Sequence, residues 1–409
     1  MTVAPARVRP PDRPLPGLLR ARFGWWSSGR RRRRDLQRPA QVLRRLGCSR
    51  LPGTGADTEL YEALDAYDRP FGLVVVPGTG HTSVTLALRP PGADLLTPDG
   101  AASWVDALGA WLAPTAAGPT FAGCTVGVLH PGSPDVAAGG VAPAVTLQLT
   151  WLARGPQGRT DPAALAAELG GRLPHLVNDL RRRGVGTARP LAAAERVRAV
   201  ATAYDPDGGG AARAWPEAAP RLAVEAWDRL RHDSATSLTW CLREVPADRV
   251  LSGVLAELAA APDGVLAARS RVALLYRPAA PPGGHRIEPA APDDDWTGLP
   301  PGVLAPPPPL AGPPAAPPPG PPPGSRAPAA AGPDLTALVA VSVTGRPDDR
   351  DALLDDAVRG VLDGVAPTLR PWLRPLYGSA AAAFAATVPG GTLLDVHSLP
   401  AAAVREAGA

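Results

Sequence analysis

A proline-rich tract divides the chain and most limits what it can fold into. Residues 278–333 contain 21 prolines in 56 positions. Proline lacks a backbone N–H and has a fixed φ, so this tract is expected to be extended polyproline II rather than part of a core. Because the entropic cost of closing a loop grows only with the logarithm of its length, the tract can still connect two halves of one domain.

Short apolar segments with strand and helix periodicity lie on both sides of this tract. Between residues 66 and 210 we predict strands at 71–76, 83–88, 124–129 and 145–152, and helices at 98–112, 163–183 and 191–203. Asp161-Pro162 is predicted to cap the 163–183 helix, and Gly184 to end it. Further along we predict helices at 222–230, 249–261 and 350–365, and strands at 237–245, 269–276, 335–343 and 374–377. The first helix has one apolar face, made by Trp104, Leu108, Trp111 and Leu112. In the 222–230 helix, Leu222, Trp227 and Leu230 are candidate core residues.

This order of elements predicts an α+β protein with two ferredoxin-like domains built from split β-α-β units. The first domain spans residues 66–210. The second joins residues 211–277 to 334–392 and is interrupted by the linker 278–333. The alternative is two separate small domains, but each half would be near the roughly 40-residue lower limit for independent folding. Residues 393–409 are predicted to be a tail.

All 42 basic residues of the chain are arginine, and none is lysine. P-loop nucleotide hydrolases, protein kinases and pyridoxal-phosphate enzymes each need a lysine, so these three classes are excluded. The three cysteines and six histidines stand apart, without the spacings of a zinc site. We therefore expect no catalytic set, no metal, no cofactor and no small-molecule substrate, and hence no enzymatic activity.

The net charge of +4 is unevenly distributed. Residues 1–50 hold 14 arginines against two acids, whereas the rest of the chain is acidic. We predict that residues 1–65 form a disordered basic arm with short helices at 16–23 and 36–46. Its aromatic and basic cluster is Phe23, Trp25, Trp26, Arg30, Arg31, Arg32, Arg33 and Arg34. Such residues fit an anionic membrane surface; nucleic acid is a second partner they could bind, and a solvated tail without a partner is the third interpretation.

Several short motifs resemble those of a known family. Its candidate motif residues here are Tyr204, Asp205, Trp227, Asp228, Arg231, Asp233, Tyr377, Gly378, Phe384 and Pro389. The segments that carry them, at 197–206, 223–246 and 376–390, resemble an actinobacterial family of membrane proteins from secretion and conjugation loci, and more distantly the type VII secretion component EccE. The resemblance covers about 65–277 and 333–391, and it implies a structural role for these residues.

The resemblance implies a non-catalytic component of a type VII or type IV-like secretion or conjugation apparatus. Its partners would be other subunits of that machine, including an ATPase encoded elsewhere. Members of the family normally begin with transmembrane helices followed by a basic stretch, and residues 23–34 match only the basic stretch. We therefore expect peripheral docking at the cytoplasmic face of the membrane, with a cytoplasmic location as the alternative. A soluble nucleic-acid-binding accessory protein of a mobile element is the alternative function.

Overall fold

Thirteen strands of the described chain form one antiparallel sheet. The computed structural model describes residues 43–91, 98–118, 120–130, 144–152, 161–242, 269–278, 334–365, 367 and 369–397. The strands are β1 (Arg44–Ser49), β2 (Thr58–Leu64), β3 (Pro70–Val76), β4 (His81–Arg89), β5 (Phe121–His130), β6 (Ala144–Leu152), β7 (Thr187–Pro190), β8 (Ala223–Glu225), β9 (Leu230–His232), β10 (Ala235–Leu242), β11 (Arg269–Arg277), β12 (Asp334–Thr344) and β13 (Arg374–Pro375). The helices are α2 (Pro98–Ala116), α3 (Pro162–Arg182), α4 (Ala193–Tyr204), α6 (Arg350–Gly364), α7 (Ala380–Ala386) and α8 (Leu394–His397), with 3₁₀ turns at Gly209–Ala211, Trp215–Ala218 and Arg370–Trp372.

The prediction of two ferredoxin-like domains is wrong, because the sheet is continuous from one end of the chain to the other. Its strand order is β1-β2-β3-β4-β6-β5-β11-β12-β10-β9-β8, with β7 also on β4 and β13 also on β10. The two predicted domains are joined where β5 pairs with β11, from Cys124 opposite Tyr276 to His130 opposite Ser270. Separate domains would each leave a strand edge with unpaired backbone N–H and C=O groups at this position. The β5–β11 pairing gives the backbone groups of both edges hydrogen-bond partners.

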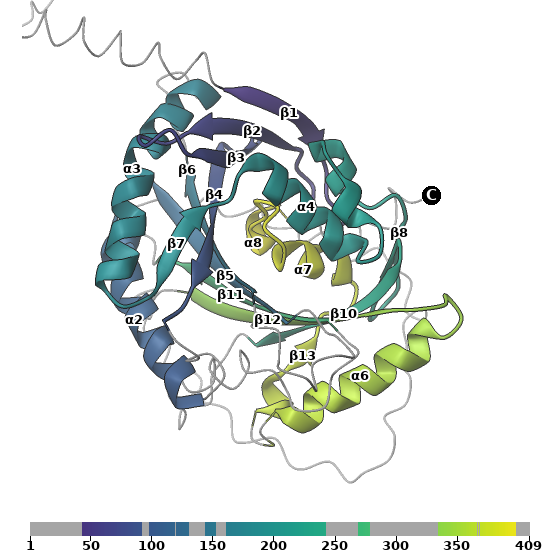
Figure 1. The fold of residues 1–409 in the computed structure, drawn as a ribbon. Coiled ribbons are helices and arrows are strands. Elements are labelled where there is room, and N and C mark those ends of the chain that lie inside the picture. Colours follow the sequence, from purple (N-terminus) through teal and green to yellow (C-terminus); the bar gives the residue numbers. More distant parts are fainter. Residues whose placement is uncertain are drawn as a thin grey trace, which may run out of the picture.

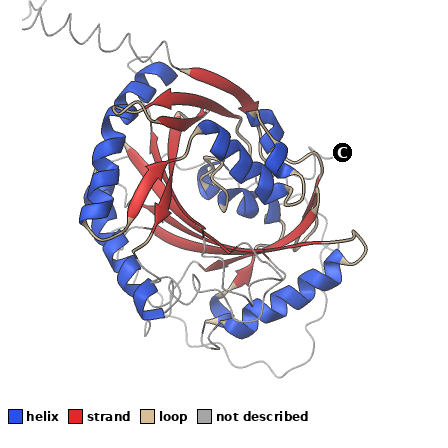
Figure 2. Cartoon of the chain, viewed as in Figure 1, coloured by secondary structure: helices blue, strands red, loops and turns tan. Residues whose placement is uncertain are grey.

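The sheet curls strongly, so that helices cover its two faces in different ways. Helices α4, α7 and α8 lie inside the curve, whereas α2, α3 and α6 lie against the outer face (Figure 1). Figure 2 shows the strands as one arc around the inner helices. The chain therefore has an outer core between sheet and outer helices, and an inner core enclosed by the curve.

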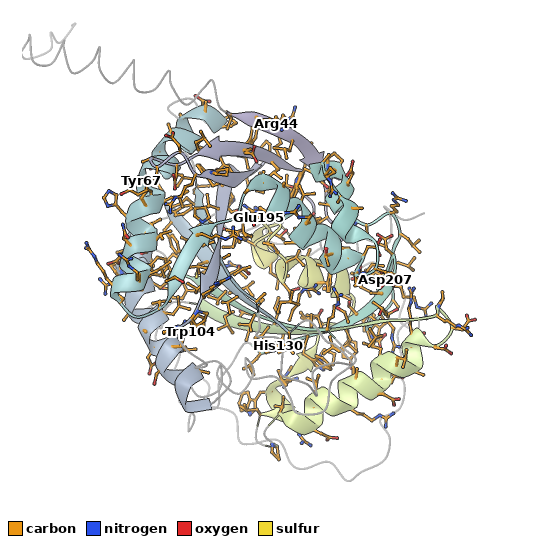
Figure 3. All side chains as sticks on the ribbon, viewed as in Figure 1. Arg44, Tyr67, Trp104, His130, Glu195 and Asp207 are labelled. Carbon is orange, nitrogen blue, oxygen red and sulfur yellow. The ribbon has the colours of Figure 1, made fainter. Side chains whose placement is uncertain are left out.

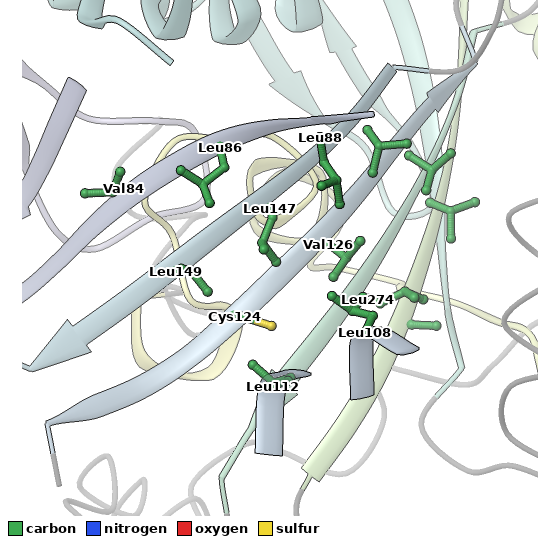
Figure 4. Close-up of a cluster of buried hydrophobic side chains, with 14 of the residues drawn as sticks. Val84, Leu86, Leu88, Leu108, Leu112, Cys124, Val126, Leu147, Leu149 and Leu274 are labelled. Carbon is green, nitrogen blue, oxygen red and sulfur yellow. The ribbon is translucent and has the colours of Figure 1, made fainter. Parts of the chain in front are cut away.

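The outer core is built from alternate side chains of the strands. On β4, β6, β5 and β11, these alternate apolar side chains point toward α2, whose Leu108 and Leu112 lie over them (Figure 4). The predicted apolar face of this helix is confirmed, because Trp104 and Trp111 are buried in the same cluster as these leucines. Period-two alternation along each strand determines which residues enter this core.

The inner core is lined by small and aromatic side chains. Helix α7 consists almost entirely of alanine, and its Phe384 packs with Tyr204, the last residue of α4, at a ring separation of 5.1 Å. Small side chains let α7 approach the backbone closely: a Cβ added at Gly53, whose φ is +74°, would lie 2.2 Å from the amide nitrogen of Ala382.

A fully buried arginine connects α4 to the inner face of the sheet. The Nε of Arg196 donates to the carbonyl oxygen of Pro389 at 2.6 Å. Its two other nitrogens donate to the carbonyl oxygens of Gly72 (3.3 Å) and Ser83 (3.0 Å), to Ser83 Oγ (2.8 Å) and to Gln148 Oε1 (3.2 Å). Burial lowers the pKa of the Arg196 guanidinium to about 9, so it remains charged at neutral pH and is stabilised by neutral acceptors alone.

The two halves of the sheet repeat the same arrangement. The first half runs β2, β3, β4, α2, β5, β6, α3, β7, α4, and its strand order is β2-β3-β4-β6-β5. The second half runs β8, β9, β10, then β11, β12, α6, β13, α7, and its order is β8-β9-β10-β12-β11. Residues 243–268, between β10 and β11, are outside the described residues. The halves meet at the antiparallel β5–β11 pair, as expected for a local two-fold axis.

Sequence identities accompany this repeat, although the sequence analysis did not find them. Residues 82–88 read Thr-Ser-Val-Thr-Leu-Ala-Leu, and residues 236–242 read Thr-Ser-Leu-Thr-Trp-Cys-Leu. Arg-Pro-Leu occurs at 189–191 and again at 374–376. The repeated residues make the same contact in both halves. The Leu191 N–H donates to the Thr85 carbonyl at 2.9 Å, and the Leu376 N–H donates to the Thr239 carbonyl at 3.0 Å.

Two local predictions are also wrong. The segment 222–230 is not a helix; it contributes β8 and the start of β9, joined by a turn. Leu230 is buried as predicted, but Leu222 and Trp227 are exposed. Residues 223–225 pair with β9 and Leu230 pairs with β10, and this strand pairing overrides the helical periodicity of the segment. In the region predicted as an arm, β1 and β2 are strands of the sheet, so residues 44–46 of the predicted 36–46 helix are extended.

The remaining secondary-structure predictions within the described residues agree with the structure. Helix α3 begins at the predicted Asp161-Pro162 cap, where the Asp161 carboxylate accepts the Ala163 N–H at 3.0 Å. It ends before Gly184, whose φ is +76°. The predicted tail 393–409 is wrong at its start, because Leu393 is buried and residues 394–397 form α8 on the inner face of the sheet. The predicted helices at 16–23 and 249–261, residues 279–333 of the proline-rich tract and residues 398–409 lie outside the described residues. Among the helices that the structure describes, none has the length and apolar character needed to cross a membrane.

Candidate functional site

The last two strands at one end of the sheet, β8 and β9, form a hairpin whose geometry is fixed by a carboxylate. Asp233 accepts the backbone N–H groups of Arg221 (3.2 Å) and Leu222 (2.8 Å), while its own N–H donates to the Leu222 carbonyl at 3.1 Å. The turn is closed by the Ala226 N–H, which donates to the Arg229 carbonyl at 2.8 Å. Trp227 and Asp228 therefore form the tip of the hairpin.

This hairpin concentrates the exposed apolar side chains of the described residues. On the hairpin, Leu222 is 56% exposed, Val224 49% and Trp227 62%, and Tyr377, which follows β13, is 52% exposed. These are four of the seven exposed large apolar side chains in the described part of the chain. Single exposed apolar residues are ordinary, whereas a local group of them is typical of a binding surface. We call Leu222, Val224, Trp227 and Tyr377 the hairpin surface.

Two of these residues form an exposed aromatic pair. The rings of Trp227 and Tyr377 are stacked, with centroids 5.7 Å apart and planes 13° from parallel. The Gly378 N–H donates to the Trp227 carbonyl at 2.7 Å, which holds the two segments together. Gly378 has φ +67°, a conformation that other residues adopt only with strain, so this position favours glycine. The aromatic pair is thus held rigidly although it faces solvent.

Charged residues surround one side of the hairpin surface. The Arg229 guanidinium contacts Asp228 (2.9 Å), Asp351 (3.4 Å) and Asp355 (3.4 Å). Hydrogen bonds to Asp228 raise the pKa of Arg229 and lower the pKa of Asp228. Arg231 also pairs with Asp351, which lies on α6. This network attaches the hairpin to α6 and is the kind of charged rim that borders apolar binding surfaces.

The outer edge of β8 is a second feature of this end of the sheet. The backbone groups of Leu222 and Ala226 bond to Asp233 and Arg229, the residues that flank β9, so by alternation those of Ala223 and Glu225 point away from β9. No other strand in the described part of the chain pairs with β8 on that side. An extended segment of another protein could add to such an edge, although β8 is only three residues long.

A buried hydrogen-bonded cluster lies behind the hairpin, on the inner face of the sheet. His232 Nδ1 donates to the Tyr204 carbonyl, and its Nε2 accepts from Ser237 Oγ at 2.7 Å. Ser237 Oγ then accepts from Ser342 Oγ at 2.7 Å, since its proton is directed to the histidine. Burial lowers the pKa of His232 to about 4, so the ring is neutral at neutral pH.

The structure brings most of the predicted motif residues to one region, although they are far apart in sequence. Trp227, Asp228, Arg231, Asp233, Tyr377 and Gly378 build the hairpin surface and its supports, as described above. Tyr204 and Phe384 pack beside His232, whose ring lies 5.6 and 4.9 Å from theirs. Asp205 accepts from Ser234 Oγ at 2.5 Å. Pro389 is separate, as its carbonyl accepts from Arg196.

The predicted membrane-binding residues 23–34 lie outside the described residues. The structure therefore adds nothing to that prediction.

One polar cluster was missed by sequence reasoning. His81 Nδ1 lies 2.8 Å from Thr79 Oγ1, which lies 3.1 Å from His397 Nε2, and His397 Nδ1 accepts the Leu393 N–H at 3.0 Å. Burial lowers the pKa of His81 to about 4 and that of His397 to about 3. More than 300 residues separate the two histidines, and no local pattern marks the contact.

Both ring nitrogens of His232 are hydrogen-bonded to neutral groups. The described residues contain no group of three or more His, Cys, Asp or Glu side chains that could hold a metal ion. Comparison with known proteins adds no assignment, since no protein-family model and no curated protein matches the chain.

Proposed function

We propose that this protein is a non-catalytic binding component of a larger assembly and that the hairpin surface contacts a partner protein. The observation that carries the proposal is the exposed Trp227–Tyr377 stack, supported from behind by a hydrogen bond and a glycine turn. Tryptophan and tyrosine contribute large contact area at low entropic cost, and they are enriched among the residues that dominate binding energy. Leu222 and Val224 extend the apolar area along β8.

The repeat of the two halves supplies a comparison for this surface. The β2–β3 turn carries Tyr67-Asp68-Arg69 where the β8–β9 turn carries Trp227-Asp228-Arg229. Tyr67 is 65% exposed but has only Arg69 over its ring, at 5.4 Å. Figure 3 shows Tyr67 on the opposite side of the molecule from Asp207, which bonds to Ser234 near the β8–β9 end. The first half thus has an exposed aromatic tip without the surrounding apolar group.

The motif resemblance supports the more specific proposal that the partner belongs to a secretion or conjugation apparatus. The motif residues form the hairpin surface and the structure beneath it, so the surface is where a family-specific partner would bind. Docking at the cytoplasmic face of the membrane is part of the same proposal and rests on the composition of residues 23–34.

Site-specific photo-crosslinking in the native cells tests the partner proposal. With p-benzoylphenylalanine in place of Trp227, we expect one dominant crosslinked product that contains a subunit of a secretion or conjugation machine, identified by mass spectrometry. The same probe at Tyr67 is the matched control and should not give that product. Equal products from both positions, no product at 227, or a product unrelated to such a machine would contradict the proposal.

Vesicle co-sedimentation tests the membrane part. The full chain should pellet with vesicles that contain anionic lipid and stay in solution with neutral ones, because attraction is about 1 kcal/mol for each basic residue near the surface. Replacing Arg30–Arg34 by alanine should abolish pelleting. If the chain instead ignores anionic vesicles and binds DNA with an affinity that falls steeply with salt, the nucleic-acid alternative replaces the membrane proposal.

A further inference from the structure

A second buried arginine lies on the inner face of the sheet, in the half opposite to Arg196. Arg271 on β11 is only 6% exposed, and its guanidinium carbon lies 5.5 Å from the centre of the Phe384 ring. The neighbouring positions Val272 and Leu274 belong to the outer core, so alternation directs Arg271 to the inner side. It therefore lies in the same enclosed region as Tyr204 and His232, which also pack on Phe384.

The two buried arginines differ in how their donors are satisfied. Arg196 donates to five acceptors on the sheet and the chain around residue 389. The Nη1 of Arg271 is buried without any hydrogen-bond partner. A buried donor without a partner is costly, and a charged one more so, and native proteins normally satisfy such groups. Of these two buried guanidinium groups, that of Arg196 is therefore fully hydrogen-bonded, whereas that of Arg271 is not.

A second unpartnered donor packs against the same phenylalanine as Arg271. The Tyr204 hydroxyl is fully buried and has no hydrogen-bond partner. Tyr204 and Arg271 act on each other electrostatically, and both contact Phe384. His232, Ser237 and Ser342 do not complete them, because these three side chains are already bonded to one another.

The charges near this position favour an anion. Arg269 lies two residues before Arg271, on the same side of β11, is partly exposed, and lowers the pKa of Arg271 by repulsion in addition to burial. No carboxylate of the described residues is among the groups that act on the pKa of Arg271. Near the adjacent His232, the positive charge of Arg350 lowers the pKa of the ring and the negative charge of Asp233 raises it. The Asp233 carboxylate is already hydrogen-bonded to two backbone N–H groups, so it does not supply the missing partner of Arg271. A water molecule could accept a hydrogen bond here, but it would not neutralise the buried charge.

We propose that Arg271 and Tyr204 form a binding site for a small oxyanion, either a carboxylate or a phosphate group. Its oxygens accept from Arg271 Nη1 and from the Tyr204 hydroxyl, the two unpartnered donors whose side chains pack on Phe384. Oxygens of this kind match the planar donors of a guanidinium, and the charge-assisted bonds are roughly twice as strong as neutral ones. Arg269 lies nearer solvent on the same strand face and attracts the anion toward the site. This ligand class is separate from the partner that the hairpin surface is proposed to bind.

Thermal unfolding in a series of acetate or phosphate concentrations tests the site, with ionic strength held constant by fluoride. We expect the melting temperature of the full chain to rise saturably with one of the two anions, because a ligand that binds only the folded state stabilises it. Comparing the acetate series with the phosphate series shows whether the site binds a carboxylate or a phosphate group. Arg181→Met, at an exposed position near the end of α3, is the control for general salt effects and should respond like the wild type.

Two variants make the test specific. Tyr204→Phe removes only an unpartnered hydroxyl, so without anion its melting temperature should equal or exceed that of the wild type, while its apparent anion affinity should fall about tenfold. Arg271→Met should abolish the saturable response altogether. The proposal is overturned if the wild type shows no saturable response to either anion, or if both variants respond as the wild type does.

Discussion

Replacing Arg196 by methionine should lower the free energy of unfolding by about 3–5 kcal/mol, although the residue is part of no proposed binding surface. The change removes the five hydrogen bonds that Arg196 donates to buried acceptors on Gly72, Ser83, Gln148 and Pro389, although Gln148 Oε1 still accepts the Gly391 N–H at 3.0 Å. Losing one side of a buried, charge-assisted hydrogen-bond set typically costs this much. Urea unfolding followed by tryptophan fluorescence measures the difference.

The same helix offers a matched control. Arg198 lies two residues further along α4 and is exposed. Arg198→Met should change the unfolding free energy by no more than about 0.5 kcal/mol. Arg196→Lys keeps the charge but loses the planar set of donors, so it should fall between wild type and Arg196→Met. A loss at Arg196 no larger than that at Arg198 would show that these contacts contribute little to holding α4 on the sheet.

Acidification should destabilise the protein strongly between about pH 6.5 and pH 5, where His81, His232 and His397 begin to charge in the unfolded chain. Burial lowers the pKa of His81 and His232 to about 4 and that of His397 to about 3, from an ordinary value of 6.5. The unfolded chain therefore binds protons first, so stability is complete above about pH 6.5 and decreases as the pH falls toward the folded values. At pH 5 each histidine costs about 2 kcal/mol, which together is a large part of a typical net stability.

The charged groups around the three histidine rings mainly lower the pKa values of these rings. Arg277 faces both His81 and His397, and His81 also acts on His397. Arg271 and Arg350 lower the pKa of His232, while Asp233 and the hydrogen bond to the Tyr204 carbonyl oppose them. Protonation would also reverse hydrogen bonds, since His232 Nε2 accepts from Ser237. Acid should therefore loosen the chain segments that these histidines hold on the inner face.

The slope of unfolding free energy against pH measures this effect independently of absolute stability. Each histidine adds about 1.4 kcal/mol per pH unit to the slope in this window. His81→Asn, His232→Asn and His397→Asn should each reduce the slope by about one proton. His175→Asn, at an exposed position of α3, should leave it unchanged. An unaltered slope in all three variants would show that these buried histidines do not cause the pH dependence of stability.

Local sequence patterns predicted much of the secondary structure because the relevant forces are local. The face of α2 at Trp104, Leu108 and Trp111, the Asp161 cap of α3 and the end of α3 at Gly184 follow from periodicity and backbone capping. The segment 222–230 was mispredicted because its strand pairing involves residues beyond it: Ala223 and Val224 pair with His232 and Arg231, and Leu230 pairs with Ser237 of β10. Pairing partners contribute more than helix propensity, which is a weak preference for any single residue.

The candidate sites show the same difference between local patterns, which the sequence reveals, and contacts between distant residues, which it does not. The motif resemblance singled out Trp227 and Tyr377, but their stacking joins segments that are 150 residues apart in sequence. Arg271 has no local signal at all, since its incomplete hydrogen bonding exists only relative to Tyr204 and Phe384. The repeat of Thr-Ser-x-Thr at 82–85 and 236–239 was visible in the sequence, and its meaning became clear only from the matching strand order.

By itself, the sequence determined the positions of most strands and helices, the absence of lysine chemistry, and the separation of the folded part by a proline-rich tract. Each follows from residue type or short-range periodicity, which do not depend on distant partners. The tertiary structure decided that the strands join at β5 and β11 into one curled sheet, that two arginines become buried on its inner face, and that an aromatic pair remains exposed at one end. These features depend on contacts between residues distant in sequence, where burial and hydrogen-bond satisfaction are set by the assembled fold.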